Sequence, residues 1–296
     1  MNKRTLAVLL LVFAIASCAH GTQSSTTSTD QTSPTVSPSP TASPSPAAIS
    51  SSAATPQSVN YTDLTGIFGA KEIMQLASLG VFGDATGAFE PAKSLSRREF
   101  VRWMFKANNA IWASDATKLI HPAQGEDSLF TDIKSSDPDA QYIQGLQDAG
   151  ISVGFPDKTF RPDQPITREQ ALAMKAALDR GGVEANYVIT KKDPSYGYYN
   201  LPDWKDKKSI SPEYVGAIAT GVQDDKGAAN EAPDYVLNIE RTFGAIAALN
   251  PKARLTRGQA AIMLWRMGPH ARSTQLEPAR TAGDALLPPS SATATP

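Results

Sequence analysis

A short pattern occurs three times in this chain with identical internal spacing. It consists of a hydrophobic residue, any residue, proline, three further residues, a hydrophobic residue, Ser or Thr, and finally Arg. The copies are 89–97, 160–168 and 249–257, which we call the first, second and third motif. A pattern repeated in this way is typical of one supersecondary unit that is repeated and stacked. The chain is therefore expected to fold into several similar units.

Each motif ends at the predicted start of a helix. Its Ser or Thr is a favoured N-cap residue, and a Glu or Gln follows three positions later, so that the two side chains satisfy each other's backbone N–H groups. These capping boxes pair Ser96 with Glu99, Thr167 with Gln170, and Thr256 with Gln259. Apolar residues at the third, sixth and tenth positions after the Arg then share one helix face. They are Phe100, Trp103, Ala107, Ala171, Met174, Leu178, Ala260, Met263 and Met267. Three such stripes predict an all-α fold around a central three-helix bundle.

An opening segment and a further helix are predicted before each motif. The opening segments are 61–63, 130–132 and 201–203, each ending in Asp. The helix is expected to stop at a glycine followed by an apolar residue, because glycine suits the left-handed end of a helix. These pairs are Gly80-Val81, Gly150-Ile151 and Gly221-Val222. The expected order in each unit is a strand-like segment, a helix, a loop and a second helix.

The arginine that closes each motif has no evident structural task in this pattern. A cation in the first turn of a helix is mildly unfavourable with the helix dipole. Arg97, Arg168 and Arg257 are therefore the candidate binding residues. An arginine beside a helix N-terminus suits an anionic group such as a carboxylate or a phosphate. The alternative is a solvated charge, or a salt bridge to the aspartates of the opening segments.

The N-terminal residues predict export. Within residues 1–18, two cations precede an apolar run from Leu6 to Ala16 that is too short for an ordinary spanning helix. Cys18, the single cysteine, follows small residues and resembles the lipobox of bacterial lipoproteins. That resemblance implies an acylated Cys18 at the mature N-terminus, and an ordinary cleaved signal with an incidental cysteine is the alternative.

Two segments have the composition of disordered chain. Residues 19–58 consist almost entirely of Ser, Thr, Pro, Ala and Gln, and residues 270–296 are similar. Such segments have little apolar surface to bury and are expected to stay solvated. We therefore predict a long tether between Cys18 and the folded part, and a disordered C-terminal tail.

Other classes of function find little support in the sequence. The formal net charge is −1 and no basic stripe indicates nucleic-acid binding, while no apolar run beyond the signal is long enough to span a bilayer. His20, His121 and His270 have no partner at metal-ligand spacing, and no phosphate loop or nucleophile elbow is present. No metal, cofactor or catalytic site is therefore predicted. A wall-glycan hydrolase, using loop carboxylates at 126–127 or 224–225, is the enzymatic alternative.

Taken together, the motifs resemble the S-layer homology family, whose repeats open with Phe-x-Asp and close with Thr-Arg-Ala-Glu. The corresponding signatures here are 96–99, 167–170 and 256–259, and Phe130 to Arg180 is the most complete copy. The resemblance implies repeats at 59–115, 128–182 and 200–269 in a pseudo-threefold all-α arrangement. It also implies binding of peptidoglycan-linked cell wall polysaccharide, often with acidic pyruvylated sugars, in grooves between repeats. The family's groove arginine corresponds to Arg97, Arg168 and Arg257.

This sequence departs from the family pattern at several places. The third copy lacks an aromatic residue in its opening segment, carries an insertion near 224–241, and has Gly258 after the signature arginine. In the second copy, Asp137-Pro138 replaces the aromatic residue that usually precedes the first helix. The second copy thus lacks an expected sugar-stacking platform, and Gly258 weakens the start of the third helix. The grooves are ranked second, first and third by their agreement with the family pattern.

The resemblance and the lipobox together imply an exported lipoprotein of the cell envelope. In a two-membrane bacterium the lipid would most simply sit in the outer membrane, with the folded part on the periplasmic side. In a single-membrane bacterium it would sit in the outer face of the plasma membrane. An envelope protein-interaction or spacer role, without glycan binding, is the alternative function.

Overall fold

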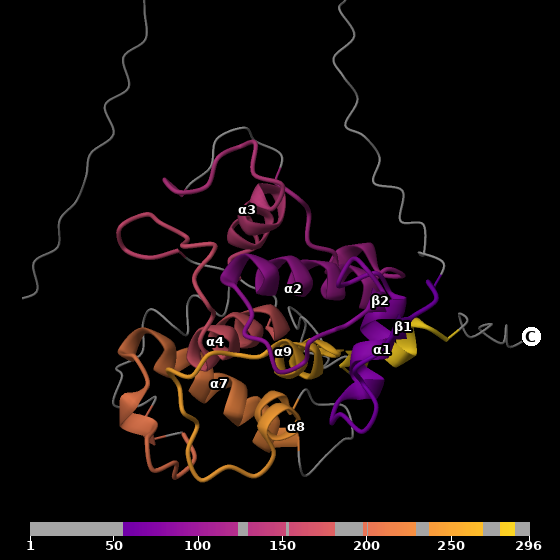
Figure 1. Ribbon diagram of the computed structural model, residues 1–296. Helices are drawn as coiled ribbons and strands as arrows, with labels where there is room; N and C mark the ends of the chain where they lie inside the picture. The colour runs from indigo at the N-terminus through magenta and orange to yellow at the C-terminus, as the bar shows by residue number, and fades with distance from the viewer. Residues whose placement is uncertain are drawn as a thin grey trace, which may run out of the picture. The chain divides into compact units, whose positions relative to one another are not determined.

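The computed structural model describes residues 56–123, 130–151, 154–180, 198–199, 201–228, 237–268 and 279–287. Cys18, the tether up to residue 55, His20, His270 and the 126–127 carboxylates lie outside these described residues. The described chain is mostly helical (Figure 1). None of its helices is both long and apolar enough to cross a membrane.

The described elements are mainly α-helices, with two short strand pairs. The α-helices are α1 (Ala70–Ser78), α2 (Arg97–Ile111), α3 (Ala140–Asp148), α4 (Arg168–Asp179), α7 (Pro212–Ala228), α8 (Asn238–Phe243), α9 (Arg257–Leu264) and α10 (Ala282–Ala285). Single 3₁₀ turns occupy Ala116–Lys118 and Lys207–Ser209. Strand β1 (Asn60–Tyr61) pairs in parallel with β2 (Thr86–Gly87), and β3 (Arg266–Met267) pairs antiparallel with β4 (Arg280–Thr281).

The capping boxes predicted for the three motifs are confirmed. Helices α2, α4 and α9 each begin at the arginine of a motif, and in each the N-cap side chain and the third residue of the helix exchange hydrogen bonds with each other's backbone N–H. The nine predicted stripe residues are all buried. Met267 lies in β3 and not in a helix, because α9 ends at Leu264.

Two of the three predicted stops of the preceding helix are confirmed. Gly80 and Gly150 have φ of 74° and 70°, and the N–H of the next residue donates to a carbonyl five residues back. The predicted stop at Gly221 is wrong, because α7 continues to Ala228. A Cβ at Gly221 would lie 3.4 Å from the Cβ of Ala176 on α4. Gly221 therefore lies inside α7 on the face that packs against α4, and the two helices lie side by side in Figure 1.

An aspartate clamps the first two residues of each motif. Its two carboxylate oxygens accept the two successive backbone N–H groups at 2.7–2.9 Å. The pairs held are Phe89-Glu90 by Asp63, Phe160-Arg161 by Asp132, and Leu249-Asn250 by Asp206. The second residue of each pair has φ between 53° and 58°, a left-handed conformation that is costly for a non-glycine residue. The clamp therefore stabilises a strained turn at the start of every motif.

The third clamp corrects the predicted opening segment. Asp206 holds the third motif, whereas the side chain of Asp203 is fully exposed and pairs with Lys207 at 3.0 Å. The opening segment is therefore 204–206 and not 201–203. Its first residue is Trp204, so the aromatic residue that the sequence analysis reports as missing is present, three positions further on. The side chain of Trp204 is buried.

The clamp at the first motif predicts a loss of stability in acid. The N–H of Phe89, and with it that of Glu90, lowers the pKa of Asp63 below its ordinary value. A carboxyl group with a lowered pKa in the folded state contributes stability above its unfolded pKa of about 4 and loses it as the pH falls through the folded value. Urea unfolding at pH 5 to 2 should therefore show a falling free energy of unfolding. Asp63→Asn should lower stability at pH 7 and flatten this dependence, and an unchanged slope would contradict the clamp.

Residues 279–287, which the sequence analysis places in a disordered tail, are structured. Strand β4 pairs with β3, and α10 begins with a capping box between Thr281 and Asp284. Ala282 is fully buried and its N–H donates to the carbonyl of Trp265 at 2.8 Å. The segment packs against α1 and α2, and its yellow ribbon lies beside α1 in Figure 1. The prediction failed because this segment is ordered by contacts with distant elements and not by its own composition.

A buried charge holds the C-terminal end of α4. Lys175 and Asp179 form an ion pair one turn apart, with Lys175 fully buried. Asp179 also accepts hydrogen bonds from the side-chain amide of Asn238 and the N–H of Gly268, both at 2.8 Å. The carboxylate therefore joins α4 to α8 and to the residue after β3.

Candidate functional site at the contacts between the motifs

The three motifs are joined to each other by backbone hydrogen bonds that close a ring. The N–H of Leu95 donates to the carbonyl of Leu255, that of Leu255 to Ile166, and that of Ile166 back to Leu95, at 2.9–3.1 Å. Each donor and acceptor is the hydrophobic residue just before the N-cap of its motif. We call the contact of α2 with the second motif the first junction, that of α4 with the third motif the second junction, and that of α9 with the first motif the third junction.

The N-termini of α2, α4 and α9 are already occupied by protein carbonyls. The N–H groups of the first two residues of each helix donate to two carbonyls of the neighbouring motif at 2.8–3.1 Å. For α2 the acceptors are Gln164 and Pro162, for α4 they are Ala253 and Pro251, and for α9 they are Lys93 and Pro91. The expected anion site at the helix ends is therefore absent from these three helices. An anionic ligand at a junction would have to be met by the guanidinium groups.

Each candidate arginine does have a structural task. Its side chain donates to the backbone carbonyl of the first residue of the neighbouring motif. The bonds run from Arg97 Nε to Phe160 (2.9 Å), from Arg168 Nη1 to Leu249 (2.9 Å) and from Arg257 Nε to Phe89 (2.7 Å). The same peptide segment is thus held by the aspartate clamp within its own unit and by an arginine from the next. The motif spacing alone could not show this, because donor and acceptor lie far apart in the chain.

Aromatic rings lie beside all three guanidinium groups at cation–π distances. The Cζ of Arg97 is 4.8 Å from the ring centroid of Phe155, that of Arg168 is 4.6 Å from Phe243, and that of Arg257 is 4.8 Å from Trp103. Phe160 and Phe89 also lie within 5 Å of Arg97 and Arg257, respectively. Phe155 and Phe243 were not predicted as site residues from the sequence. They occupy different positions relative to their motifs, so no common spacing marks them.

The three arginines differ in accessibility. Arg97 is 1% exposed, and burial lowers its pKa to about 10. Arg168 is half-buried, and burial lowers its pKa as well. The side chain of Arg257 is 18% exposed, and its Nη1 lies 3.4 Å from a carboxylate oxygen of Glu99. Within the described part of the chain, none of the three forms an ion pair with a clamp aspartate. The salt-bridge alternative to binding is therefore not supported at those aspartates.

The residue that follows the motif arginine is positively charged at the first junction, negatively charged at the second and uncharged at the third. Arg98 at the first junction contacts Asp137 at 3.0 Å and Asp163 at 2.8 Å. Glu169 at the second junction contacts Lys252 at 2.6 Å and accepts from the N–H of Ser211 at 2.9 Å. The third junction has Gly258 in this position, where a Cβ would lie 3.1 Å from the carbonyl oxygen of Pro91. At this position the first two junctions carry ion pairs of reversed polarity, while the third has close backbone packing and an ion pair between Arg257 and Glu99.

Reversing the charge at the first junction should destabilise the protein. Arg98→Glu places a carboxylate beside Asp137 and Asp163, and we expect a loss of about 2 kcal/mol in the free energy of unfolding. Adding Asp163→Lys reproduces the polarity of the second junction and should recover about 1 kcal/mol. Urea unfolding of the two single variants and the double variant gives the coupling energy. Additive losses would show that the two side chains do not interact.

Comparisons with known proteins find similarity over the parts of the chain that contain the first and second motifs. The sequence model of the S-layer homology domain matches residues 60–101 and 129–172. The chain is 28% identical over 105 residues to a surface layer protein of Brevibacillus choshinensis, and 31% identical over 155 residues to a cellulosome-anchoring protein of Acetivibrio thermocellus. These matches cover 35% and 49% of this chain but 9% and 32% of the two relatives.

A middle cell wall protein of Brevibacillus brevis is similar at 30% identity over 105 residues, again 9% of that relative. The chain therefore spans less than a third of the length of each of these proteins. The matched residues include the clamps Asp63 and Asp132 and the arginines Arg97 and Arg168. The first and second motifs thus lie in two S-layer homology domain matches, at residues 60–101 and 129–172.

Proposed function

We propose that the folded part of this chain is a non-catalytic module that anchors the protein to the cell wall by binding peptidoglycan-linked polysaccharide. The observation that carries the proposal is the S-layer homology match over the first two motifs. The three relatives, a surface layer protein, a middle cell wall protein and a cellulosome-anchoring protein, support the same class of role. Acidic sugars, such as pyruvylated ones, are the proposed ligand class because the candidate site residues are arginines.

We further propose that the third motif belongs to a third repeat of the same kind. Asp206 and Arg257 make the same two contacts as their counterparts in the matched motifs, one with the backbone N–H groups and one with the carbonyl at the start of a motif. The closed ring of backbone hydrogen bonds supports a pseudo-threefold arrangement around α2, α4 and α9. On this proposal the module has three related junctions, and the residue after the motif arginine forms an ion pair at the first two.

Direct saccharide contact is assigned to the accessible arginines. Arg257 and Arg168 are partly exposed and could offer their remaining guanidinium N–H groups to a carboxylate. Arg97 is buried, so its proposed part is to hold the first junction and to add positive potential there.

Phe68 is a second candidate contact at the third junction. Its side chain is 77% exposed, which is unusual for a large apolar residue. The adjacent Gly69 packs against Ile262 of α9, where an added Cβ would lie 2.5 Å from the isoleucine side chain. Ile262 and Arg257 belong to the same helix, α9. The exposed ring of Phe68 is proposed as a surface on which a sugar can stack.

The proposal includes a membrane tether. An acylated Cys18 would hold the N-terminus in a membrane, and the Ser-, Thr- and Pro-rich residues 19–58 would span the distance to the wall. At a maximum of roughly 3.3–3.6 Å per residue, such a tether reaches more than about 100 Å. The protein would then connect a membrane to the peptidoglycan layer of the cell envelope.

Sedimentation with isolated sacculi tests wall binding. The full chain carrying Cys18→Ser, which removes any lipid contribution, should sediment with sacculi and stay in solution once the wall-linked polysaccharide has been stripped chemically. Arg257→Gln should weaken binding about tenfold through loss of a charge-assisted hydrogen bond. Arg254→Ala is the matched control, because it removes an exposed arginine from the same motif.

Two outcomes would overturn this proposal. Sedimentation that survives stripping would point to another wall component, and no sedimentation at all would favour the alternative of an envelope protein partner. Equal losses for Arg257→Gln and Arg254→Ala would mean that the motif arginine has no special part in binding. Circular dichroism of each variant shows whether it is folded under the assay conditions.

A further inference from the structure

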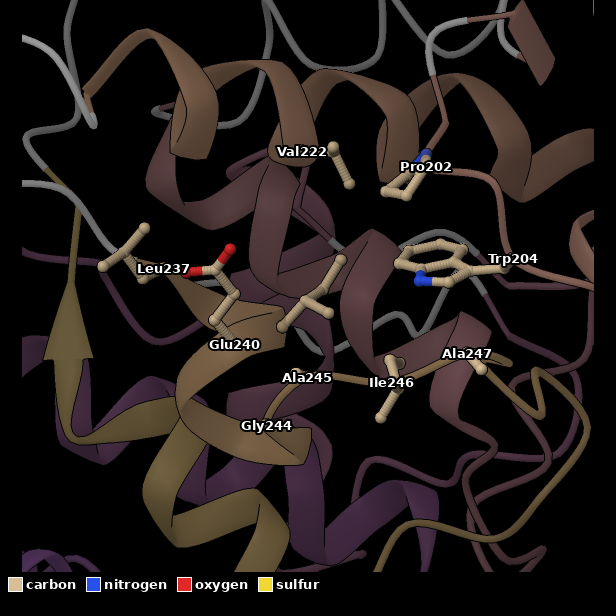
Figure 2. Close-up of a pocket in the computed structure, with 10 residues that line it drawn as sticks. Pro202, Trp204, Val222, Leu237, Glu240, Gly244, Ala245, Ile246 and Ala247 are labelled. Carbon is tan, nitrogen blue, oxygen red and sulfur yellow. The ribbon is translucent and has the colours of Figure 1, made fainter.

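A pocket of about 570 Å³ opens between α7, α8 and two loops beside the third motif. Its walls include Trp204, Val222, Ile239 and Ile246. Figure 2 shows Trp204, Val222 and Ile246 around one space. The volume falls within the range of about 300–1,000 Å³ that is typical of small-molecule sites. None of the three candidate arginines lines it. The pocket is therefore separate from the junctions to which saccharide binding is assigned.

The sequence of the third unit explains why this space is open. In the second unit, a Cβ at Gly154 would lie 2.2 Å from the ring of Phe130, and that ring packs 5.4 Å from the ring of Phe160. In the third unit, Trp204 takes the place of Phe130, but Leu249 takes the place of Phe160. The loop 244–248 reads Gly-Ala-Ile-Ala-Ala, and a Cβ at Gly244 would have nothing within 4 Å. The third unit thus has an aliphatic residue in place of Phe160 and mostly small loop side chains along the pocket.

The chemistry of the lining selects one class of ligand. Glu240 supplies the one ionisable side chain among the residues that line the pocket, and the others are apolar apart from the indole N–H of Trp204. Figure 2 shows the Glu240 carboxylate on the side of Leu237, across the pocket from Trp204. Within the described residues, this carboxylate has no hydrogen bond or ion pair, and Glu240 is exposed at the mouth. A polyhydroxylated sugar would find too few polar partners here.

We propose that this pocket binds a small aliphatic primary amine. The alkyl chain would lie between Trp204, Val222, Ile239 and Ile246, and the ammonium group would pair with the carboxylate of Glu240. Burial of the chain supplies most of the affinity, at roughly 0.8 kcal/mol for each CH₂ group, and the ion pair selects the amine over neutral analogues. The inference is independent of wall binding, since it concerns other residues and another ligand class.

Titration with n-hexylamine, n-hexanol and hexanoate tests this assignment. Protein-observed NMR on the full chain carrying Cys18→Ser should show saturable shifts for the amine near Trp204, with the alcohol binding about tenfold more weakly and hexanoate not binding. Glu240→Gln should reduce the affinity for the amine to that for the alcohol. Glu213→Gln, at an exposed carboxylate in the first turn of α7 outside the pocket, should leave the affinity unchanged.

A second variant tests the location. Ala245→Phe should fill the pocket and abolish binding of both amine and alcohol. The proposal is overturned if the amine shows no saturable binding, if amine and alcohol bind equally, or if Glu213→Gln has the effect of Glu240→Gln. Glu240→Gln should still sediment with sacculi like the unaltered chain, so failure of the amine site and failure of wall binding can be told apart.

Discussion

Replacing Arg97 with alanine should lower the free energy of unfolding by about 3–4 kcal/mol. The side chain is 1% exposed, its Nε donates to the carbonyl of Phe160, and its guanidinium lies 4.7 Å and 4.8 Å from two phenylalanine rings. Alanine would leave a cavity at the first junction and a carbonyl without its donor. Urea unfolding followed by circular dichroism measures the loss.

The other two motif arginines provide an internal comparison for this experiment. Arg168 and Arg257 make the same bond to a carbonyl but remain partly exposed, so their alanine variants should lose only about 1–2 kcal/mol. Arg254→Ala, at an exposed position, should change stability by less than about 0.5 kcal/mol. If Arg97→Ala behaved like Arg254→Ala, the structural task assigned to the buried arginine would be wrong. A wall-binding defect in Arg97→Ala would then report on a ligand contact and not on folding.

Asp206→Ala should lower the free energy of unfolding by about 2–3 kcal/mol, whereas Asp203→Ala should change it by less than about 0.5 kcal/mol. The carboxylate of Asp206 accepts the N–H groups of Leu249 and Asn250, at 2.9 Å and 2.7 Å, and Asn250 sits in the left-handed region with φ 53°. Without the carboxylate, two backbone donors lose their acceptor and the strained turn loses its support. The side chain of Asp203 is fully exposed, and its carboxylate pairs with Lys207 at 3.0 Å in an ion pair open to solvent.

The pair of aspartates makes a sharp control because both belong to one short segment and carry the same charge. Removing either changes the net charge equally, so any difference in stability comes from the hydrogen bonds. Thermal and urea unfolding of the two variants side by side gives that difference. If both variants lost the same free energy of unfolding, the assignment of Asp206 as the clamp of the third motif would be wrong. Asp206→Asn is expected to fall between the two, since the amide can accept one of the two N–H groups.

The predictions for Gly221 and for the opening aspartate of the third unit were wrong for one physical reason. Sequence patterns indicate local hydrogen bonds better than contacts between distant parts of the chain. The stops at Gly80 and Gly150 depend on residues within one helical turn and were predictable. Gly221 carries the same local signal, yet α7 continues through it to Ala228 and packs against α4. Likewise, two aspartates precede α7, and only the distant third motif decides which of them acts as the clamp.

The sequence by itself determined the three motifs, their capping boxes and the apolar stripe that each helix buries. These features are local, since every donor, acceptor and apolar position lies within about ten residues of the motif arginine. The tertiary structure alone decided the tasks of the arginines, the opposite charges of the first two junctions, the order of residues 279–287 and the open pocket beside Trp204. Each of these depends on which groups from distant parts of the chain meet, and that is set by packing between units and not by spacing within one.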